Sequence, residues 1–216
     1  MLKNKNDLKH ILDELEIMFP DAGCELVYHN IFELLIAVML SAQTTDKAVN
    51  IVTPNLFNKY PDAFSLAKAD ILEVKELIKR IGLSSSKSKN IIETSKVLVE
   101  KYNGVVPNDL MKLMELPGVG RKTANVVLSE GFKVPRIAVD THVERVSKRI
   151  GIVDGNATVL DVEMKLMELI DENNWHRSHH LLLFFGRYFC LAKKPNCDKC
   201  FNKDKCVYYN DKNLQD

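Results

Sequence analysis

The segment LPGVGRKTANVVL, from Leu116 to Leu128, restricts the fold more than any other part of the chain. Pro117 must end any helix that precedes it. Gly118 and Gly120 permit positive φ and let another backbone approach closely. An apolar pattern with helical spacing resumes directly after the turn. These features predict two helices joined by a tight turn, with Val119 packed inward between the glycines.

Two familiar phosphate-binding loops do not match this turn. A P-loop has four residues between its glycines, whereas only Val119 separates the glycines here. A dinucleotide-binding fingerprint needs a preceding strand and a third glycine where this chain has Thr123. The free N–H groups at the start of the second helix still form a general site for a phosphate oxygen. An ordinary turn between helices is the alternative.

Two cations, Arg121 and Lys122, stand where the second helix begins. Positive charge at a helix N-terminus opposes the helix dipole, so a sequence selected for stability would carry acidic residues there. The two cations therefore favour an anionic partner over an ordinary turn.

Composition and charge set broad limits on the class of protein. The 216-residue chain is 46% hydrophobic and 27% charged, the balance of a soluble globular protein. Its net charge is only +1, so binding to a nucleic acid would depend on a local basic patch. No signal-peptide core follows the polar N-terminus, and the longest apolar run, IFELLIAVML, is too short to cross a bilayer. We therefore expect a cytoplasmic protein, nucleoid-associated if bacterial, without a membrane partner.

Apolar residues recur at helical spacing almost throughout the chain, and no segment alternates persistently with period two. The sequence therefore predicts an all-α fold with about ten helices. One of these helices is expected from Ile71 to Ile81 with Gly82 just past its end, and another is expected to start near Thr158. The expected helix caps are Asp7, Asn30 in a capping box with Glu33, Asp70, and Thr141 in a capping box with Glu144.

Four of the five cysteines crowd into the C-terminal tail with the spacing C-x6-C-x2-C-x5-C: Cys190, Cys197, Cys200 and Cys206. Four thiolates this close in a reducing compartment imply a metal. Structural zinc sites usually have two short-spaced ligand pairs, whereas wide outer gaps suit one loop around an iron–sulfur cluster. The spacing thus favours iron–sulfur while leaving zinc open. Cys24 stands apart and is expected to be a buried small hydrophobic residue.

The same tail is basic, because seven lysines and arginines lie between His176 and Cys206 against only two aspartates. A basic loop held rigid by a metal is suited to contact a polyanion. Simple solvation of these lysines is the alternative. The cations are Arg177, Arg187, Lys193, Lys194, Lys199, Lys203 and Lys205.

Together these motifs resemble the endonuclease III family of DNA glycosylases. The resemblance rests on LPGVGRKTANVVL, on AVDTHVERV from Ala138 to Val146, and on the cysteine spacing, and it extends to ELLIAVMLSAQTTD from Glu33 to Asp46. It implies a bifunctional DNA glycosylase and abasic-site lyase that acts as a monomer on double-stranded DNA containing damaged bases or abasic sites. Oxidised pyrimidines are the substrates that the family leads us to expect.

The resemblance also implies two helical lobes. Residues 24–134 would form a central helical barrel with a helix-hairpin-helix motif at 108–128. Residues 1–23 and 135–216 would form a discontinuous lobe with a [4Fe–4S] cluster on the four tail cysteines. DNA would lie across both lobes, with the damaged nucleotide flipped between them. The hairpin would bind a DNA phosphate, with a monovalent cation as a further candidate ligand. The residues assigned to DNA at the hairpin and in the tail are Leu116, Gly118, Val119, Gly120, Arg121, Lys193 and Lys194.

By the same resemblance Lys122 is the catalytic nucleophile. A lysine attacks only as the neutral amine, and both a helix dipole and neighbouring Arg121 disfavour the charged form. The amine would displace the base from the sugar, and the resulting Schiff base would allow β-elimination. Asp140 would stabilise positive charge on the sugar, with Thr141 rather than Asp140 capping the next helix. The alternatives are a phosphate-neutralising lysine and an ordinary capping aspartate.

Two further residues are assigned to the gap left by a flipped nucleotide. Gln43 would fill that gap, and Leu83, in a predicted loop GLSSSKSKN, would wedge from the other strand. Family members often carry an aromatic residue after that leucine, and this chain has Ser84 instead. An ordinary helix-end amide and an ordinary post-helix hydrophobic residue are the alternatives.

Two rival functions remain at this point. An adenine-mismatch glycosylase of the same superfamily lacks a lysine at the position of Lys122 and usually carries an additional C-terminal domain, whereas only VYYNDKNLQD follows Cys206 here. A non-catalytic DNA-binding or redox module would need the turn and the cysteines, but would not use Lys122 and Asp140 together.

Overall fold

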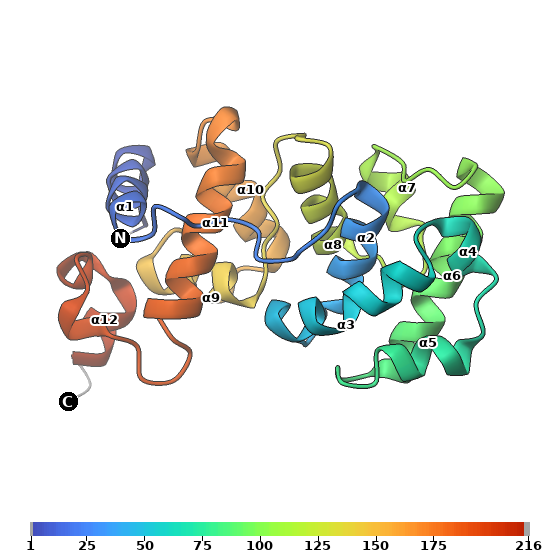
Figure 1. The fold of residues 1–216 in the computed structure, drawn as a ribbon. Coiled ribbons are helices and arrows are strands. Elements are labelled where there is room, and N and C mark those ends of the chain that lie inside the picture. The colour runs from blue at the N-terminus through green and yellow to red at the C-terminus, as the bar shows by residue number, and fades with distance from the viewer. Residues whose placement is uncertain (1, 214–216) are drawn as a thin grey trace. The chain divides into compact units, whose positions relative to one another are not determined.

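The structure is a computed structural model that describes residues 2–213 (Figure 1). Every regular element in this range is helical, which confirms the all-α prediction, and twelve α-helices replace the ten or so expected. The chain divides into two compact units. One combines the residues up to Cys24 with those from Pro135 onward, and the other is Glu25–Val134. Among the described residues, no helix is both long and apolar enough to span a membrane.

The unit Glu25–Val134 is built around one apolar helix, α2. All of its residues from Phe32 to Leu40 are buried, and it contacts α3, α6 and α8 (Figure 1). The chain continues from α8 into a π-helical turn, Val127–Gly131, which also packs on α2. The helices of this unit are α2 (Ile31–Leu40), α3 (Asp46–Lys59), α4 (Ala63–Ala67), α5 (Ile71–Leu77), α6 (Ser84–Tyr102), α7 (Leu110–Met114) and α8 (Arg121–Val126).

The other unit joins the two ends of the chain. Its helix α11 contacts both α1 and α9, and then continues into a π-helical turn, Phe185–Phe189 (Figure 1). Leu8, Leu15, Val143 and Leu182 contribute to its buried core. The helices of this unit are α1 (Lys5–Met18), α9 (Thr141–Ile150), α10 (Val159–Leu169), α11 (Trp175–Phe184) and α12 (Val207–Asn213).

The first two predicted caps are only partly correct. Helix α1 is capped by Asn4, which accepts hydrogen bonds from the N–H groups of residues 6 and 7, and Asp7 closes the capping box from inside the helix. Asn30 caps α2 as predicted, but the carboxylate of Glu33 accepts from the N–H of His29, 2.7 Å away, rather than from that of Asn30. In both cases a nearby polar side chain accepts from a backbone N–H at or just before the start of the helix, one to three positions away from the one expected.

Asp70 caps α5 as predicted, and Thr158 precedes α10 as its cap. However, α5 ends at Leu77 rather than at Ile81. Ile78 and Ile81 are both buried although the chain has already left the helix, so their apolar spacing could not distinguish a helix from the turn that follows.

The predicted loop GLSSSKSKN is mostly helix, because α6 begins at Ser84. Leu83 occupies the cap position in a left-handed conformation, with φ of 60°, and makes no side-chain capping bond. Serines and lysines are compatible with a loop or a helix, so composition alone gave the wrong assignment here.

Candidate functional site

The turn between α7 and α8 is anchored to the core of its unit. Leu116 and Val119 are both buried, which confirms that Val119 packs inward. The N–H of Val119 donates to the carbonyl of Leu116 at 3.0 Å, and the hydroxyl of Thr94 donates to the carbonyl of Pro117 at 2.7 Å. The side chains of Leu116 and Val119 therefore hold the turn in place, and an external ligand can meet only their backbone.

The two glycines of this turn have different physical roles. Gly118 has φ of 79°, and a Cβ there would lie 2.8 Å from the side-chain nitrogen of Asn90. Gly120 has φ of −92°, and a Cβ there would meet nothing within 4 Å. The expectation of positive φ thus holds for Gly118 and is wrong for Gly120. Neither glycine N–H has a hydrogen-bond partner among residues 2–213, so both are available as donors.

The N-terminus of α8 is electropositive. Its cap residue, Gly120, offers no side-chain acceptor, and no acidic residue lies in the first turn of this helix. Arg121 is half-buried and Lys122 is exposed at this end. The unsatisfied amides and the two cations therefore combine to form a site that favours an anion.

Asp140 is the N-cap of α9, so the prediction that Thr141 caps this helix is wrong. Its Oδ1 atom accepts from the N–H groups of His142 at 2.8 Å and Val143 at 2.9 Å. Asp is among the strongest N-cap residues and carries a charge that favours the positive end of the dipole, so it takes the position ahead of threonine. Both capping bonds use Oδ1, and the cap therefore does not use Oδ2.

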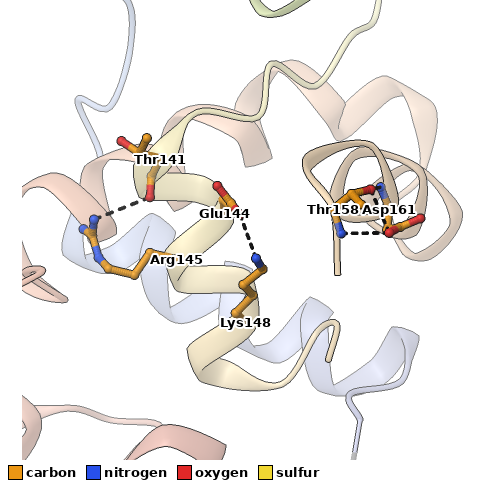
Figure 2. A network of polar contacts seen from close by, with 6 residues as sticks. All are labelled: Thr141, Glu144, Arg145, Lys148, Thr158 and Asp161. Atoms are coloured by element: carbon orange, nitrogen blue, oxygen red, sulfur yellow. Dashed lines mark hydrogen bonds and ion pairs between the residues drawn. The ribbon is translucent and has the colours of Figure 1, made fainter. Parts of the chain in front are cut away.

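Glu144 does not close a capping box with Thr141. Its carboxylate pairs instead with Lys148, one turn further along α9, at 2.7 Å (Figure 2). Arg145 on the same helix turns back toward the carbonyl of Thr141 (Figure 2). Its Nη2 donates to the carbonyl of Gly186 at 2.6 Å. These contacts hold the start of α9 in place.

All four tail cysteines line one cavity in the unit that joins the two chain ends. Burial raises the pKa of the Cys200 and Cys206 thiols, and the neighbouring cysteines raise both further. Thiolates in this cavity therefore need a positive centre to compensate them. Four soft ligands converging on one cavity fit a metal ion or an iron–sulfur cluster. Cys24 is half-buried rather than fully buried, so that expectation is wrong.

Arg149 contacts the chain just after Cys190 and again just after Cys206, an arrangement that the sequence analysis did not predict. Its guanidinium donates to the carbonyls of Leu191 at 2.6 Å and Ala192 at 3.0 Å, and lies 4.3 Å from the ring centre of Tyr208. The sequence contains no hint of this, because the partners are more than forty positions away and accept through their backbone.

The basic residues of the tail divide into two groups. Lys193 and Lys194 are exposed, as a DNA contact requires. Arg177 instead pairs with Glu16 at 2.6 Å and donates to the carbonyl of Pro20 at 2.8 Å. Arg177 therefore fastens α11 to the end of α1, and counting it with a polyanion surface was wrong.

Gln43 and Leu83 lie in turns of the same unit, and both have left-handed backbone conformations, with φ of 53° and 60°. Both side chains are exposed, and Leu83 is 57% exposed. Non-glycine residues in this conformation are costly and are typical of functional sites.

Comparison with known proteins agrees with this geometry. Residues 36–172 match the family model described as "HhH-GPD superfamily base excision DNA repair protein". Endonuclease III of Bacillus subtilis (strain 168) is 51% identical over 197 residues, which cover 91% of this chain and 90% of that protein. A solved non-covalent endonuclease III–DNA complex matches with a TM-score of 0.95 at 50% identity, covering 100% of both chains.

A second solved structure, a trapped endonuclease III–DNA covalent intermediate described as an estranged-adenine complex, matches with a TM-score of 0.94 at 50% identity. The match covers 98% of this chain and 99% of that one. With the hairpin, the helix-capping aspartate and the four clustered cysteines in place, the chain belongs to the endonuclease III family, within the HhH-GPD superfamily of base excision DNA repair proteins.

Proposed function

We propose that the protein removes damaged bases from double-stranded DNA and then nicks the strand 3′ to the abasic site. The observation that carries this proposal is an exposed lysine, Lys122, at the electropositive start of α8. A relative with 50% identity has been solved as a trapped covalent intermediate with DNA, which supports a nucleophile of this kind.

In the proposed first step, the neutral amine of Lys122 attacks C1′ of the damaged nucleotide. The new N–C1′ bond forms as the bond between C1′ and the base breaks, and the base leaves with the electron pair and takes up a proton. The sugar passes through a state with oxocarbenium character. The carboxylate of Asp140 stabilises that positive charge and assists the amine.

In the second step, the nitrogen lone pair of Lys122 forms a C1′=N bond as the C1′–O4′ bond breaks. O4′ leaves with the electron pair of that bond and takes up a proton, which opens the sugar ring and produces a protonated Schiff base between Lys122 and C1′. This imine is an electron sink, so it acidifies the C2′ proton. Loss of that proton and cleavage of the C3′–O3′ bond release the 3′ phosphate by β-elimination.

We assign DNA contacts to the hairpin, the tail and the two left-handed turns. The free N–H groups of Gly118 and Gly120 would bind a phosphate, helped by Arg121 and by a monovalent cation at the backbone carbonyls of the turn. Leu116 and Val119 would contribute through their backbone, because their side chains are buried. Exposed Lys193 and Lys194 would contact further phosphates, and Gln43 and Leu83 would enter the duplex at the flipped nucleotide.

We propose oxidised pyrimidines as the substrate class. The related trapped complex is described as an estranged-adenine complex. Adenine pairs with thymine in duplex DNA, so a damaged thymine is the lesion that we expect to leave such an adenine without its partner. An adenine-mismatch glycosylase and a non-catalytic DNA-binding or redox module are both disfavoured, because the chain is 51% identical to an endonuclease III and retains Lys122.

We propose that Cys190, Cys197, Cys200 and Cys206 hold a [4Fe–4S] cluster. Support comes from their convergence on one cavity and from membership of a family known for such a cluster. When bound, the cluster would supply four metal–thiolate bonds that hold the tail loop in shape. The chain's own residues then keep that loop closed, with Arg149 on its carbonyls and Lys3 on the carbonyl of Lys205 at 2.6 Å.

Borohydride trapping on abasic-site DNA tests the proposed function. Wild-type protein should form a stable covalent adduct, and Lys122→Ala should form none, because no other group supplies the Schiff base. Lys112→Ala is the matched control, since Lys112 is an exposed lysine on the preceding helix. Trapping that persists in Lys122→Ala would overturn the assignment.

A further inference from the structure

Lys87 is a buried cation in the second turn of α6. Only 6% of it is exposed, and burial lowers the pKa of its ammonium group. Its Nζ donates to the hydroxyl of Thr44 at 2.6 Å. Within the part of the chain that the structure describes, no carboxylate pairs with this ammonium. A buried charge held by one neutral hydroxyl is costly, so stability alone does not explain this lysine.

The side chain of Lys87 reaches the turn that carries Gln43. Thr44 is the residue next to Gln43 in the turn that follows α2. Its N–H donates to the carbonyl of Ser41 at 3.0 Å. The bond from Lys87 therefore fastens the residue next to Gln43, whose own backbone is left-handed.

The backbone of Lys87 holds the turn that carries Leu83. Its N–H donates to the carbonyl of Leu83 at 2.9 Å, and the hydroxyl of Ser86 donates to the same carbonyl at 3.0 Å. Lys87 thus connects two turns that are about forty positions apart in sequence, and both turns belong to the unit Glu25–Val134.

We infer that Lys87 is a positioning residue that fixes the Gln43 and Leu83 turns relative to each other, so that both side chains enter the duplex together. The inference rests on the proposed function, because it takes Gln43 and Leu83 as the inserting residues. If the two strained turns already have fixed relative positions, they lose less conformational freedom when DNA binds. The complex in which the damaged base is flipped out of the duplex then forms more readily. Contact between Lys87 and a phosphate is the competing role.

The test compares Lys87→Met and Thr44→Val with wild type. Methionine keeps most of the apolar stem and removes the ammonium group, and valine keeps the branched shape of Thr44 and removes the acceptor. Lys89→Met is the matched control, since Lys89 is an exposed lysine two positions further along α6. Thr44→Val also serves if Lys87→Met fails to fold, as judged by circular dichroism melting.

Three readouts separate positioning from phosphate contact. The first is the fluorescence of 2-aminopurine placed opposite a tetrahydrofuran abasic analogue, which reports insertion into the duplex. The second is the single-turnover rate of base removal from thymine-glycol duplex. The third is the slope of log affinity against log salt concentration. Borohydride trapping on single-stranded abasic DNA is measured in parallel, because that substrate has no duplex to enter.

Both variants should lower base removal by about tenfold, the factor expected for losing one charged hydrogen bond, and should reduce the 2-aminopurine response. The double variant should be no worse than the worse single variant, because both changes remove the same contact. The salt slope and the trapping of single-stranded DNA should stay at the wild-type level. A slope reduced by about one with an unchanged 2-aminopurine response would make Lys87 a phosphate contact and overturn the inference. Failure of wild-type protein to trap abasic DNA would instead refute the proposed function.

Discussion

Asp140 shows how one side chain can serve both stability and the proposed chemistry. Its Oδ1 atom caps α9 through two backbone N–H groups, whereas stabilisation of charge on the sugar depends on the negative charge of the whole carboxylate. Asparagine caps helices as well as aspartate does, because its side-chain oxygen accepts the same bonds. Asp140→Asn therefore removes the charge and keeps the cap.

This substitution should separate base removal from strand cleavage. We expect Asp140→Asn to slow removal of thymine glycol on the order of a hundredfold, the scale of losing one electrostatic contact to the transition state. Cleavage of a preformed abasic site should lose less, because no base has to leave. Single-turnover rates on both substrates measure the difference, since slow product release could mask it at steady state. Equal losses would mean that Asp140 chiefly activates the amine.

At the scale of the hairpin, alanine should destabilise the protein at Gly118 and leave its stability nearly unchanged at Gly120. Gly118→Ala should reduce the free energy of unfolding by about 1–2 kcal/mol, because φ of 79° is disfavoured for any side chain. Gly120→Ala should change it by less than about 0.5 kcal/mol, because φ of −92° suits alanine and the space is open, while glycine is preferred over alanine at the N-cap of α8.

In DNA binding, Gly120→Ala should be the more damaging of the two alanine variants. The methyl group of Gly120→Ala would stand where a phosphate is proposed to approach, so affinity should fall about tenfold, the scale of a lost charged hydrogen bond. Urea denaturation and DNA titration of both variants are the required measurements. Unchanged affinity in Gly120→Ala would exclude the hairpin as a phosphate site.

At the scale of the tail loop, Lys193 and Lys194 should act through charge alone. Both are exposed, so Lys193→Ala/Lys194→Ala should leave folding unchanged and flatten the salt dependence of DNA affinity by about two units. Lys68→Ala/Lys75→Ala is the control pair, because both lysines are exposed and lie at the end of α4 and in α5. Titrations over a salt series give the slope, and a slope equal to that of wild type would show that the two tail lysines are only solvated.

At the scale of the whole molecule, the unit that holds the four tail cysteines depends on both ends of the chain. Lys3 is buried, and its N–H and Nζ donate to the carbonyls of Gly151 and Lys205 at 2.8 Å and 2.6 Å. We expect purified protein to be yellow-brown with about four irons per chain, and Lys3→Met to release that iron faster to a chelator. The reason is that Lys3→Met frees the loop segment before Cys206.

Lys5→Met is the matched control, because Lys5 is exposed and its ion pair with Asp171 lies on the surface. Equal iron release from the two variants would mean that Lys3 does not hold the loop. One zinc and no iron in the purified protein would refute the cluster while leaving the fold intact.

The sequence by itself determined the features that depend on short stretches of chain. Helical apolar spacing and the absence of alternation were enough for the all-α fold, because the period of burial is local. The hairpin, with Val119 inward, followed from Pro117 and two glycines. The four cysteines could be grouped as ligands because they lie within one short tail.

Only the tertiary structure decided the rest. The helix in place of the predicted loop after Leu83 arises where serines and lysines fit a helix or a loop equally well and the surrounding packing selects the helix. The partners of Lys87 and Arg149 lie about forty positions away, and those of Lys3 are more distant still. No sequence periodicity encodes such pairs, because the bonds join side chains to a distant hydroxyl or to backbone carbonyls that every residue carries.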